Sequence, residues 1–177
     1  MNERVVVGIS GGIAAYKSAA LVSCLAQRGL DVSVVLTDAA TQFVGPATFS
    51  ALCNRPPVVD AFDPRFPLGP HIELATDCTL FIVAPATAHI IASCAMGLAD
   101  CLLSTLYLNM ECPILFAPAM STPMWEKAAV IRNVTQLKSD GVHFIGPDTG
   151  WLSCRRMGAG RMSEPESILA ACEPFLV

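Results

Sequence analysis

Residues 4–29 read RVVVGISGGIAAYKSAALVSCLAQRG, and this stretch decides the fold. The run RVVVGIS (4–10) is almost continuously apolar, which is typical of a strand that is buried on both faces of a parallel sheet. The next residues carry apolar side chains at helical spacing up to Gly29, a residue type that often follows the last turn of a helix. The stretch therefore predicts a buried strand followed directly by a helix.

The same alternation continues along the chain. Further strands are predicted at 31–37, 79–85, 113–120 and 142–146, and helices at 38–53, 87–109, 123–139 and 164–173. This order predicts an α/β protein of three layers, in which helices cover both faces of a parallel sheet. The proline-rich stretch 55–71 and the glycine- and arginine-rich stretch 150–162 are predicted to be irregular loops.

Length and composition limit the classes of protein. The 177 residues show no repeats and no linker, so we predict one domain over residues 1–177. The eight cysteines form neither C-x-x-C pairs nor zinc spacings, and the first residues lack the features of a signal peptide, so we expect a cytoplasmic protein without a metal. The net charge of −4 excludes the basic surface that is typical of nucleic-acid-binding proteins. The apolar share of 53% indicates that part of the surface forms an oligomer interface.

Residues 78–99 contain no Asp, Glu, Lys or Arg, which raises the possibility of a membrane span. Pro85, Thr87, His89 and Ser93 interrupt this run. A buried strand followed by a buried helix explains the run better, so no membrane partner is expected.

The ends of the predicted strands are rich in small and hydroxylated residues. In open α/β sheets the ligand lies beyond these ends. They are GISGGIAA (8–15), Thr37–Asp38, PATAH (85–89) and PAMSTPMW (118–125). G-x-G-x-x-G is absent, so Asp38 as a ribose ligand is no more favoured than Thr37 as a phosphate ligand. Together these ends point to a flat, phosphorylated ligand.

Six motifs occur in order across nearly the whole chain. They are GGIAAYK (11–17), PHIEL (70–74), PATA (85–88), GLAD (97–100), PAMSTPMW (118–125) and GWLSCRRMGAGRM (150–162). With them the chain resembles the homo-oligomeric flavin-containing cysteine decarboxylases, which include the phosphopantothenoylcysteine decarboxylases of coenzyme A biosynthesis. The resemblance implies a three-layer Rossmann-like (flavodoxin-like) fold, FMN as cofactor, and homotrimers or dodecamers whose sites form where subunits meet. Many relatives are fused to a synthetase domain, so we expect only the decarboxylase half here, with a separate synthetase chain as a candidate partner.

The resemblance also implies the residues that contact FMN. His89 lies where relatives usually have Asn or Asp, and it either contacts the flavin or packs near the interface. The implied cofactor-binding residues are Ser10, Gly11, Gly12, Thr37, Phe43, Ala86, Thr87, Ala88, His89, Ser104 and Met120.

The implied reaction gives roles to two residues. FMN oxidises the CH2SH group of the substrate to a thioaldehyde, which accepts the electrons left when CO2 departs. The product of this step is an enethiol, which needs a hydride and a proton to become the final thiol. By the resemblance, His71 assists the oxidation, and Cys154 in the flap 150–162 donates the last proton.

The substrate-binding residues depart from the family. The resemblance implies that Ser121, Met124, Trp125 and Arg161 bind substrate. Ser121 replaces an Asn that holds the substrate carboxylate in relatives, and it offers a single donor instead of an amide. Arg155 and Arg156 also replace residues that relatives usually have in the flap.

Three functions stay open at this point. The first converts 4′-phosphopantothenoylcysteine to 4′-phosphopantetheine, and the second decarboxylates the C-terminal cysteine of a peptide. The third is a non-catalytic, flavin-binding regulatory subunit. Cys154 favours the complete first reaction, whereas Ser121 favours the third reading. A flavin prenyltransferase is disfavoured by GGIAAYK and the flap.

Overall fold

The computed structural model describes residues 3–176, whose central element is a parallel sheet of five strands. All neighbouring strands pair in parallel, in the order β2-β1-β3-β4-β5. This is the flavodoxin-like strand order, so the fold predicted from the sequence is confirmed. The strands are β1 (Arg4–Ile9), β2 (Asp31–Leu36), β3 (Cys78–Ala86), β4 (Ile114–Pro118) and β5 (His143–Phe144).

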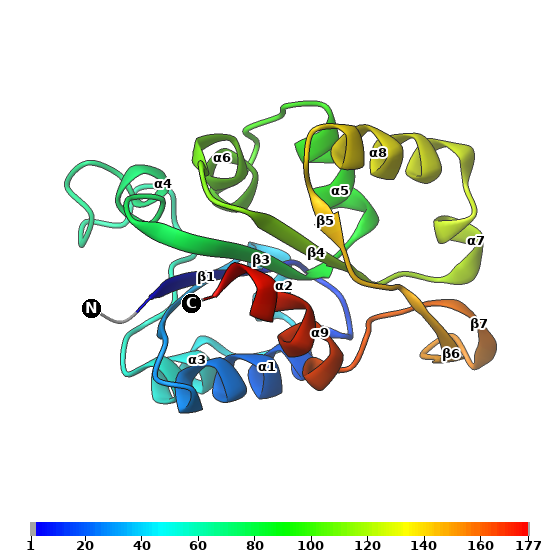
Figure 1. Cartoon of the computed structure of the whole chain (residues 1–177), viewed down its shortest axis with the longest axis horizontal. Helices are drawn as coiled ribbons and strands as arrows, with labels where there is room; N and C mark the ends of the chain where they lie inside the picture. The colour runs from blue at the N-terminus through cyan, green and yellow to red at the C-terminus, as the bar shows by residue number, and fades with distance from the viewer. Residues whose placement is uncertain (1–2, 177) are drawn as a thin grey trace.

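Helices cover both faces of this sheet and make the three layers (Figure 1). One face carries α1 (Ala15–Gln27), α3 (Pro46–Cys53) and α9 (Pro165–Cys172). The other carries α4 (Pro70–Glu73), α5 (Ala88–Ala95), α6 (Leu102–Asn109) and α8 (Ala128–Ser139). Val5 and Val7 of β1 pack in the first core and Val6 in the second, which explains why the strand sequence is continuously apolar.

Three predicted helices are each divided in two, so their predicted continuity is wrong. The region 38–53 forms α2 (Asp38–Thr41) and α3, because Pro46 starts a new helix where its missing N–H costs nothing. The region 87–109 breaks after α5, where Gly97 has a φ of +67°. The region 123–139 forms α7 (Thr122–Trp125) and α8. The turn signals at these points are short, and periodicity alone passes over them.

Residues 148–161 form an antiparallel hairpin, so the prediction of an irregular loop at 150–162 is wrong. Its strands are β6 (Asp148–Leu152) and β7 (Arg156–Arg161), and they lie apart from the main sheet, beyond the carboxyl ends of its strands (Figure 1). The turn is closed by the N–H of Arg155, which has a φ of +62° and donates to Leu152 O over 2.9 Å. The glycines of the stretch hide the alternation that marks a strand.

The hairpin is held against the loop that follows β4. Met120 N–H donates to Gly160 O over 2.9 Å, and the Thr122 hydroxyl donates to Ala159 O over 2.7 Å. An isolated two-stranded hairpin is at best marginally stable in water, so these contacts fix its position.

Replacing Gly160 with alanine is expected to detach the hairpin. Gly160 has a φ of +135°, and a Cβ at this position would overlap Met120 O. Strain and overlap together should lower the free energy of unfolding by about 2–4 kcal/mol, or release β7 and make it sensitive to protease. Thermal unfolding and limited proteolysis measure this. Gly45→Ala, where no atom lies within 4 Å of the new Cβ, is the control. Equal behaviour of the two variants would contradict the prediction.

The proline-rich stretch and the apolar run at 78–99 both fold as the sequence predicts. The stretch from Arg55 to Gly69 consists mainly of bends and turns until α4 begins at Pro70, as predicted. Residues 78–99 form β3, α5 and the turn after it, as the reading of a buried strand and helix requires. Across residues 3–176, no helix has the length and apolar character needed to cross a membrane.

Candidate active site

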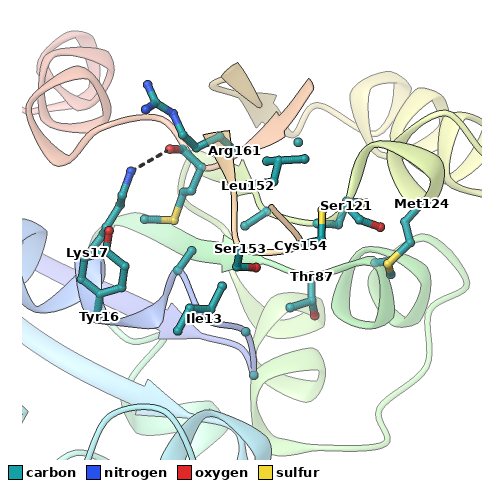
Figure 2. Close-up of a pocket in the computed structure, with 18 of the residues that line it drawn as sticks. Ile13, Tyr16, Lys17, Thr87, Ser121, Met124, Leu152, Ser153, Cys154 and Arg161 are labelled. Carbon is teal, nitrogen blue, oxygen red and sulfur yellow. Dashed lines mark hydrogen bonds between the residues drawn. The ribbon is translucent and has the colours of Figure 1, made fainter. Parts of the chain in front are cut away.

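A cavity of about 780 Å3 lies at the carboxyl ends of β1, β3 and β4, under the hairpin (Figure 2). In the flavodoxin-like order, β2 is added on one side of β1, whereas β3 and the later strands are added on its other side, and ligands bind where this order reverses, between β1 and β3. The volume is within the range of about 300–1,000 Å3 found for small-molecule and cofactor sites. The lining residues are Gly11, Gly12, Ile13, Ala14, Tyr16, Lys17, Thr87, Ala88, His89, Ala119, Met120, Ser121, Met124, Trp151, Leu152, Ser153, Cys154, Gly160, Arg161, Met162 and Glu164.

Hydrogen bonds of Ser10 connect the two segments that form the floor of the cavity. Ser10 is buried, and its hydroxyl donates to Pro85 O over 2.7 Å and accepts from Thr87 N–H over 3.1 Å. These bonds join the end of β1 to the end of β3. The small residues of the loop 11–14 then leave backbone and the start of α1 facing the cavity, as an anionic ligand requires.

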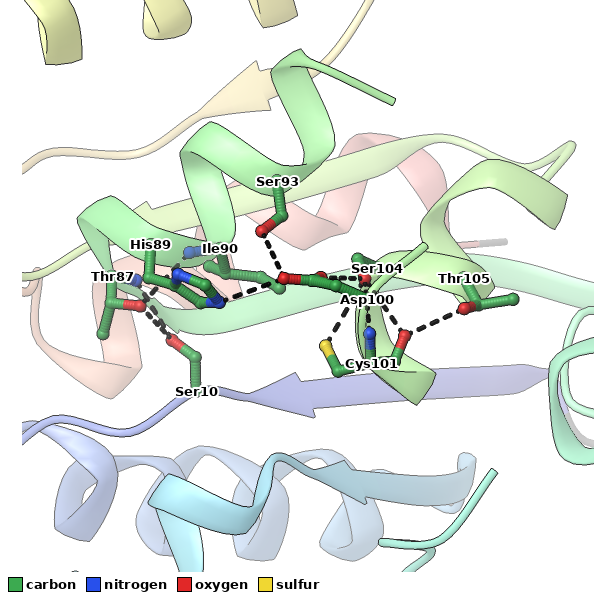
Figure 3. A network of polar contacts seen from close by, with 9 residues as sticks. All are labelled: Ser10, Thr87, His89, Ile90, Ser93, Asp100, Cys101, Ser104 and Thr105. Carbon is green, nitrogen blue, oxygen red and sulfur yellow. Dashed lines mark hydrogen bonds and ion pairs between the residues drawn. The ribbon is translucent and has the colours of Figure 1, made fainter. Parts of the chain in front are cut away.

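A polar network supports the wall formed by α5 (Figure 3). His89 Nε2 lies 3.4 Å from Asp100 Oδ2, and the Ser104 hydroxyl donates to Asp100 Oδ1 over 2.8 Å. The Ser93 hydroxyl donates to Asp100 Oδ2 over 3.3 Å. The hydrogen bond from Ser104 is the main reason why the pKa of Asp100 lies below its ordinary value. Asp100 is thus kept ionised and orients His89 at the cavity.

An ionic cluster forms the opposite wall. Lys17 Nζ lies 2.8 Å from Glu164 Oε1, and Arg161 Nη2 lies 3.5 Å from the same oxygen. The hydrogen bond from Lys17 is the main cause that lowers the pKa of Glu164. Lys17 also approaches Met162 O, at 3.4 Å, and its side chain is only 12% exposed. The cluster joins α1 to the segment that leaves the hairpin.

Cys154 is the exposed thiol of the cavity and lies in the hairpin turn. Other cysteines have a different environment: burial raises the pKa of Cys94, and that of Cys172 to about 12. A buried thiol with a raised pKa is inert, whereas an exposed thiol at a cavity can exchange protons with a ligand.

Apolar side chains line much of the remaining wall. Ile13, Tyr16, Met124 and Trp151 all line the cavity and are 46–61% exposed. Large apolar side chains of this kind can enclose a flat aromatic ligand. Ser121, at the start of α7, brings a hydroxyl to the same cavity.

The structure brings most of the predicted site residues to this one cavity. Those that line it are Gly11, Gly12, Thr87, Ala88, His89, Met120, Ser121, Met124, Cys154 and Arg161. Others lie outside its lining: Ser10, Thr37, Phe43, Ala86, Ser104 and Trp125. Ser10 and Ser104 support lining residues as described above, whereas the Thr37 hydroxyl accepts from Ala40 N–H over 3.2 Å and caps α2.

His71 lies at the other end of the sheet from Cys154 (Figure 1). Its helix α4 is held near the start of β1, because Arg4 Nη1 donates to Glu73 O over 3.0 Å. The nine residues of β3 run from this end to the cavity, which is about 30 Å at roughly 3.3 Å per residue. Within one chain, therefore, the His71 side chain does not reach the cavity that Cys154 lines.

Sequence reasoning missed several lining residues. Lys17 and Glu164 are the most informative, because they form the ionic wall. Lys17 belongs to the GGIAAYK motif, so the sequence did mark it as a candidate site residue. Its partner Glu164 lies 147 positions away, and no local sequence pattern marks such a contact. Tyr16 and Trp151 were similarly visible only as parts of longer motifs.

Fold and cavity together define a doubly wound α/β protein with a small-molecule site at its topological switch point. The chain belongs to the Flavoprotein family, whose model matches residues 1–176.

Three proteins illustrate the similarity. The coenzyme A biosynthesis bifunctional protein CoaBC of Bacillus subtilis is 43% identical over 173 residues, which are 97% of this chain and 43% of that protein. A PPC decarboxylase mutant complexed with pantothenoylaminoethenethiol superposes with a TM-score of 0.87 at 27% identity, over 99% of this chain and 98% of the other. The FMN-dependent cysteine decarboxylase SpaF superposes with a TM-score of 0.84 at 29% identity, over 96% of this chain and 94% of the other. The chain spans less than half the length of the CoaBC relatives.

Proposed function

We propose that the protein is an FMN-dependent decarboxylase that acts on a cysteinyl carboxylate, with 4′-phosphopantothenoylcysteine as substrate and 4′-phosphopantetheine as product. One observation carries the proposal: the hairpin brings Cys154 to the same cavity as Ser121 and the loop Gly11–Ala14, at the switch point of a flavodoxin-like sheet. The similarity to CoaBC and to PPC decarboxylase supports this choice of substrate.

The residues of the cavity fit FMN. The loop 11–14, which leads into α1, offers backbone N–H groups to a phosphate, while Ile13, Tyr16 and Trp151 offer apolar surface to a flat ring. Thr87, Ala88 and His89 complete this wall at the start of α5. When bound, FMN supplies the oxidation of the substrate CH2SH group and the later return of a hydride. The proposal also includes as cofactor residues five that lie outside the lining of the cavity: Ser10, Thr37, Phe43, Ala86 and Ser104.

The chain's own residues hold the substrate and move protons. Ser121 binds the carboxylate, and Met124 lines the cavity around the cysteinyl group. Trp125 is proposed as a further substrate residue, although it lies outside the lining of the cavity. The Cys154 thiol gives a proton to the enethiol carbon at the end of the cycle, and His71 takes part in the proton transfer of the first oxidation. The exposed position of Cys154 in the hairpin turn supports its role as an acid that reaches the substrate when the flap is closed.

A complete site on this proposal needs two subunits. His71 and Cys154 lie at opposite ends of the sheet, so a neighbouring chain supplies the histidine. Large apolar side chains near His71 are exposed and fit an interface: Phe62, Leu68 and Ile72 are 89%, 69% and 40% exposed. We propose a homotrimer, or a dodecamer built from trimers, with each site between two subunits.

Further parts of the proposal concern the cellular setting. The chain forms a single flavoprotein domain over residues 1–177, works in the cytoplasm in coenzyme A biosynthesis, and has a separate synthetase as a possible partner. The bifunctional nature of the CoaBC relatives supports the synthetase. Decarboxylation of a peptide C-terminal cysteine and a non-catalytic flavin-binding role are the outcomes to be distinguished.

The test of the proposed function combines colour with mass spectrometry. The purified protein should be yellow, and with 4′-phosphopantothenoylcysteine it should give a product lighter by CO2 and with no net loss of hydrogen. A product that is two hydrogens lighter still would indicate a decarboxylase that stops at the enethiol. A colourless protein that does not take up FMN would overturn the proposal.

Replacing Ser121 with asparagine tests how the substrate carboxylate is held. The amide offers two N–H donors and a longer reach than the hydroxyl. If carboxylate binding limits the reaction, Ser121→Asn should lower KM by about tenfold, the effect of one or two additional hydrogen bonds to a charged group. Steady-state kinetics measures this, with Ser121→Ala as the opposite control. A higher KM in Ser121→Asn than in Ser121→Ala would contradict the prediction.

A further inference from the structure

We propose that Glu73 is a positioning residue for His71, because its carboxylate fixes the segment Leu68–Gly69 that lies beside the His71 ring. This inference rests on the proposed function, in which His71 takes part in the first oxidation. It gives a role to a second residue of the PHIEL motif (70–74).

His71 lies on a helix that is too short to be stable by itself. α4 has four residues, and isolated helices of this length do not form in water. Its orientation therefore depends on contacts with the rest of the chain. At the end of the helix, Arg4 Nη1 donates to Glu73 O over 3.0 Å and to Thr76 O over 2.8 Å. These bonds fix the backbone where α4 ends, and other contacts fix its start.

The Glu73 carboxylate fixes the segment that precedes α4. Leu68 N–H donates to Glu73 Oε1 over 2.8 Å, so the half-buried side chain reaches back to the start of the helix. A hydrogen bond from a backbone N–H to a carboxylate is charge-assisted and is stronger than one between neutral groups. The bond closes a loop from Leu68 to Glu73, and His71 lies within this loop.

The His71 ring lies beside the segment that Glu73 fixes. Gly69 has a φ of +95°, and a Cβ at this position would lie 3.0 Å from His71 Cε1 and 3.1 Å from His71 Nδ1. The ring thus lies next to the place that a side chain would take at position 69. Releasing Leu68 from Glu73 frees this segment and changes the surroundings of the ring.

The backbone of His71 is fixed separately, by α6. Asn109 Nδ2 donates to His71 O over 3.0 Å, and α4 and α6 pack against each other (Figure 1). Because Asn109 and Arg4 still hold the helix, loss of the Glu73 contact should change the orientation of the ring without detaching α4. The Glu73 side chain therefore acts on the reaction through His71.

Two substitutions of Glu73 test the role of its oxygen as an acceptor. Glu73→Ala removes the acceptor, and the misplaced histidine should lower kcat for CO2 release by about 10–100-fold, with KM changed less than about twofold. Glu73→Gln keeps an oxygen acceptor, so its kcat should stay within about threefold of the wild-type value. The matched control is Glu111→Ala, which removes an exposed carboxylate from the loop before β4 and should behave as the wild type. An equal loss in Glu73→Gln and Glu73→Ala would overturn the proposal.

Mixed oligomers test whether the effect is confined to the subunit that supplies His71. Glu73→Ala assembled with Cys154→Ser should recover formation of the final thiol, because some sites then combine native Glu73, His71 and Cys154. Glu73→Ala assembled with His71→Asn should not recover it, because every site then lacks either Glu73 or His71. Recovery in both combinations would overturn the proposal. Recovery in neither would also overturn it where His71→Asn and Cys154→Ser complement each other.

A measurement on the histidine itself does not depend on turnover. The chain has three histidines, so protein labelled with carbon-13 at histidine Cε1 should give three resonances, and the one that His71→Asn removes belongs to His71. This resonance should shift in Glu73→Ala and keep its position in Glu73→Gln, while the other two stay unchanged. If the wild type releases no CO2, the proposed function fails, and this spectrum alone decides whether Glu73 positions the ring. An unshifted His71 resonance in Glu73→Ala would overturn the proposal.

Discussion

Cys154→Ser should leave the release of one CO2 per bound flavin almost unchanged and stop the formation of the final thiol. Further turnovers then need oxygen to reoxidise the flavin. A hydroxyl is a much weaker acid than a thiol, so the serine cannot protonate the enethiol carbon at a useful rate. Removing a general acid typically costs a factor of about 10²–10⁴, so the rate of final product formation should fall by at least a hundredfold. Mass spectrometry should show a product two hydrogens lighter, and absorbance should show the flavin left in its reduced form under anaerobic conditions.

The control and the contrary result for Cys154 are equally specific. Cys53→Ser changes a thiol at the end of α3, which does not line the cavity, and it should behave as the wild type. Formation of the fully reduced thiol by Cys154→Ser at the wild-type rate would assign Cys154 no part in the reaction. The hairpin would then serve only to cover the cavity.

His71→Asn should abolish CO2 release, because the first oxidation then lacks its proton-transfer group. The expected loss is again a factor of about 10²–10⁴. The position of His71, about 30 Å along β3 from the cavity, makes a second result more decisive. His71→Asn and Cys154→Ser should complement each other when they are assembled into one oligomer.

The arithmetic of complementation follows from cyclic symmetry. Each site of a trimer would take His71 from one subunit and Cys154 from its neighbour, so every mixed trimer has one site with both native residues. Hetero-oligomers, purified through two different tags, should therefore form the final thiol at about one third of the wild-type rate. Each variant alone should form almost none. Mixed oligomers without this activity would contradict a site shared between subunits.

The sequence by itself determined the parts of the fold that depend on neighbouring residues. Largely apolar runs predicted all five parallel strands. The signal is clearest in the four strands that are mostly buried, because a strand covered on both faces needs apolar side chains at nearly every position. Small and hydroxylated residues at strand ends, such as Gly11, Gly12 and Thr87, predicted the place of the cavity, because parallel strands bring their ends to one edge. Breaks within helices were missed, since a single Gly97 or Pro46 only weakens a periodic pattern.

Only the tertiary structure decided which distant residues meet. Glycines allow both a loop and a hairpin at 148–161, and the docking of Gly160 on Met120 selects the hairpin. His71 and Cys154 carry equally clear motifs, yet the length of β3 keeps them apart within a chain. Lys17 and Glu164 are separated by 147 positions, so their contact leaves no local pattern. Such contacts depend on how α1 and the hairpin pack around the sheet, and this packing is a property of the whole chain.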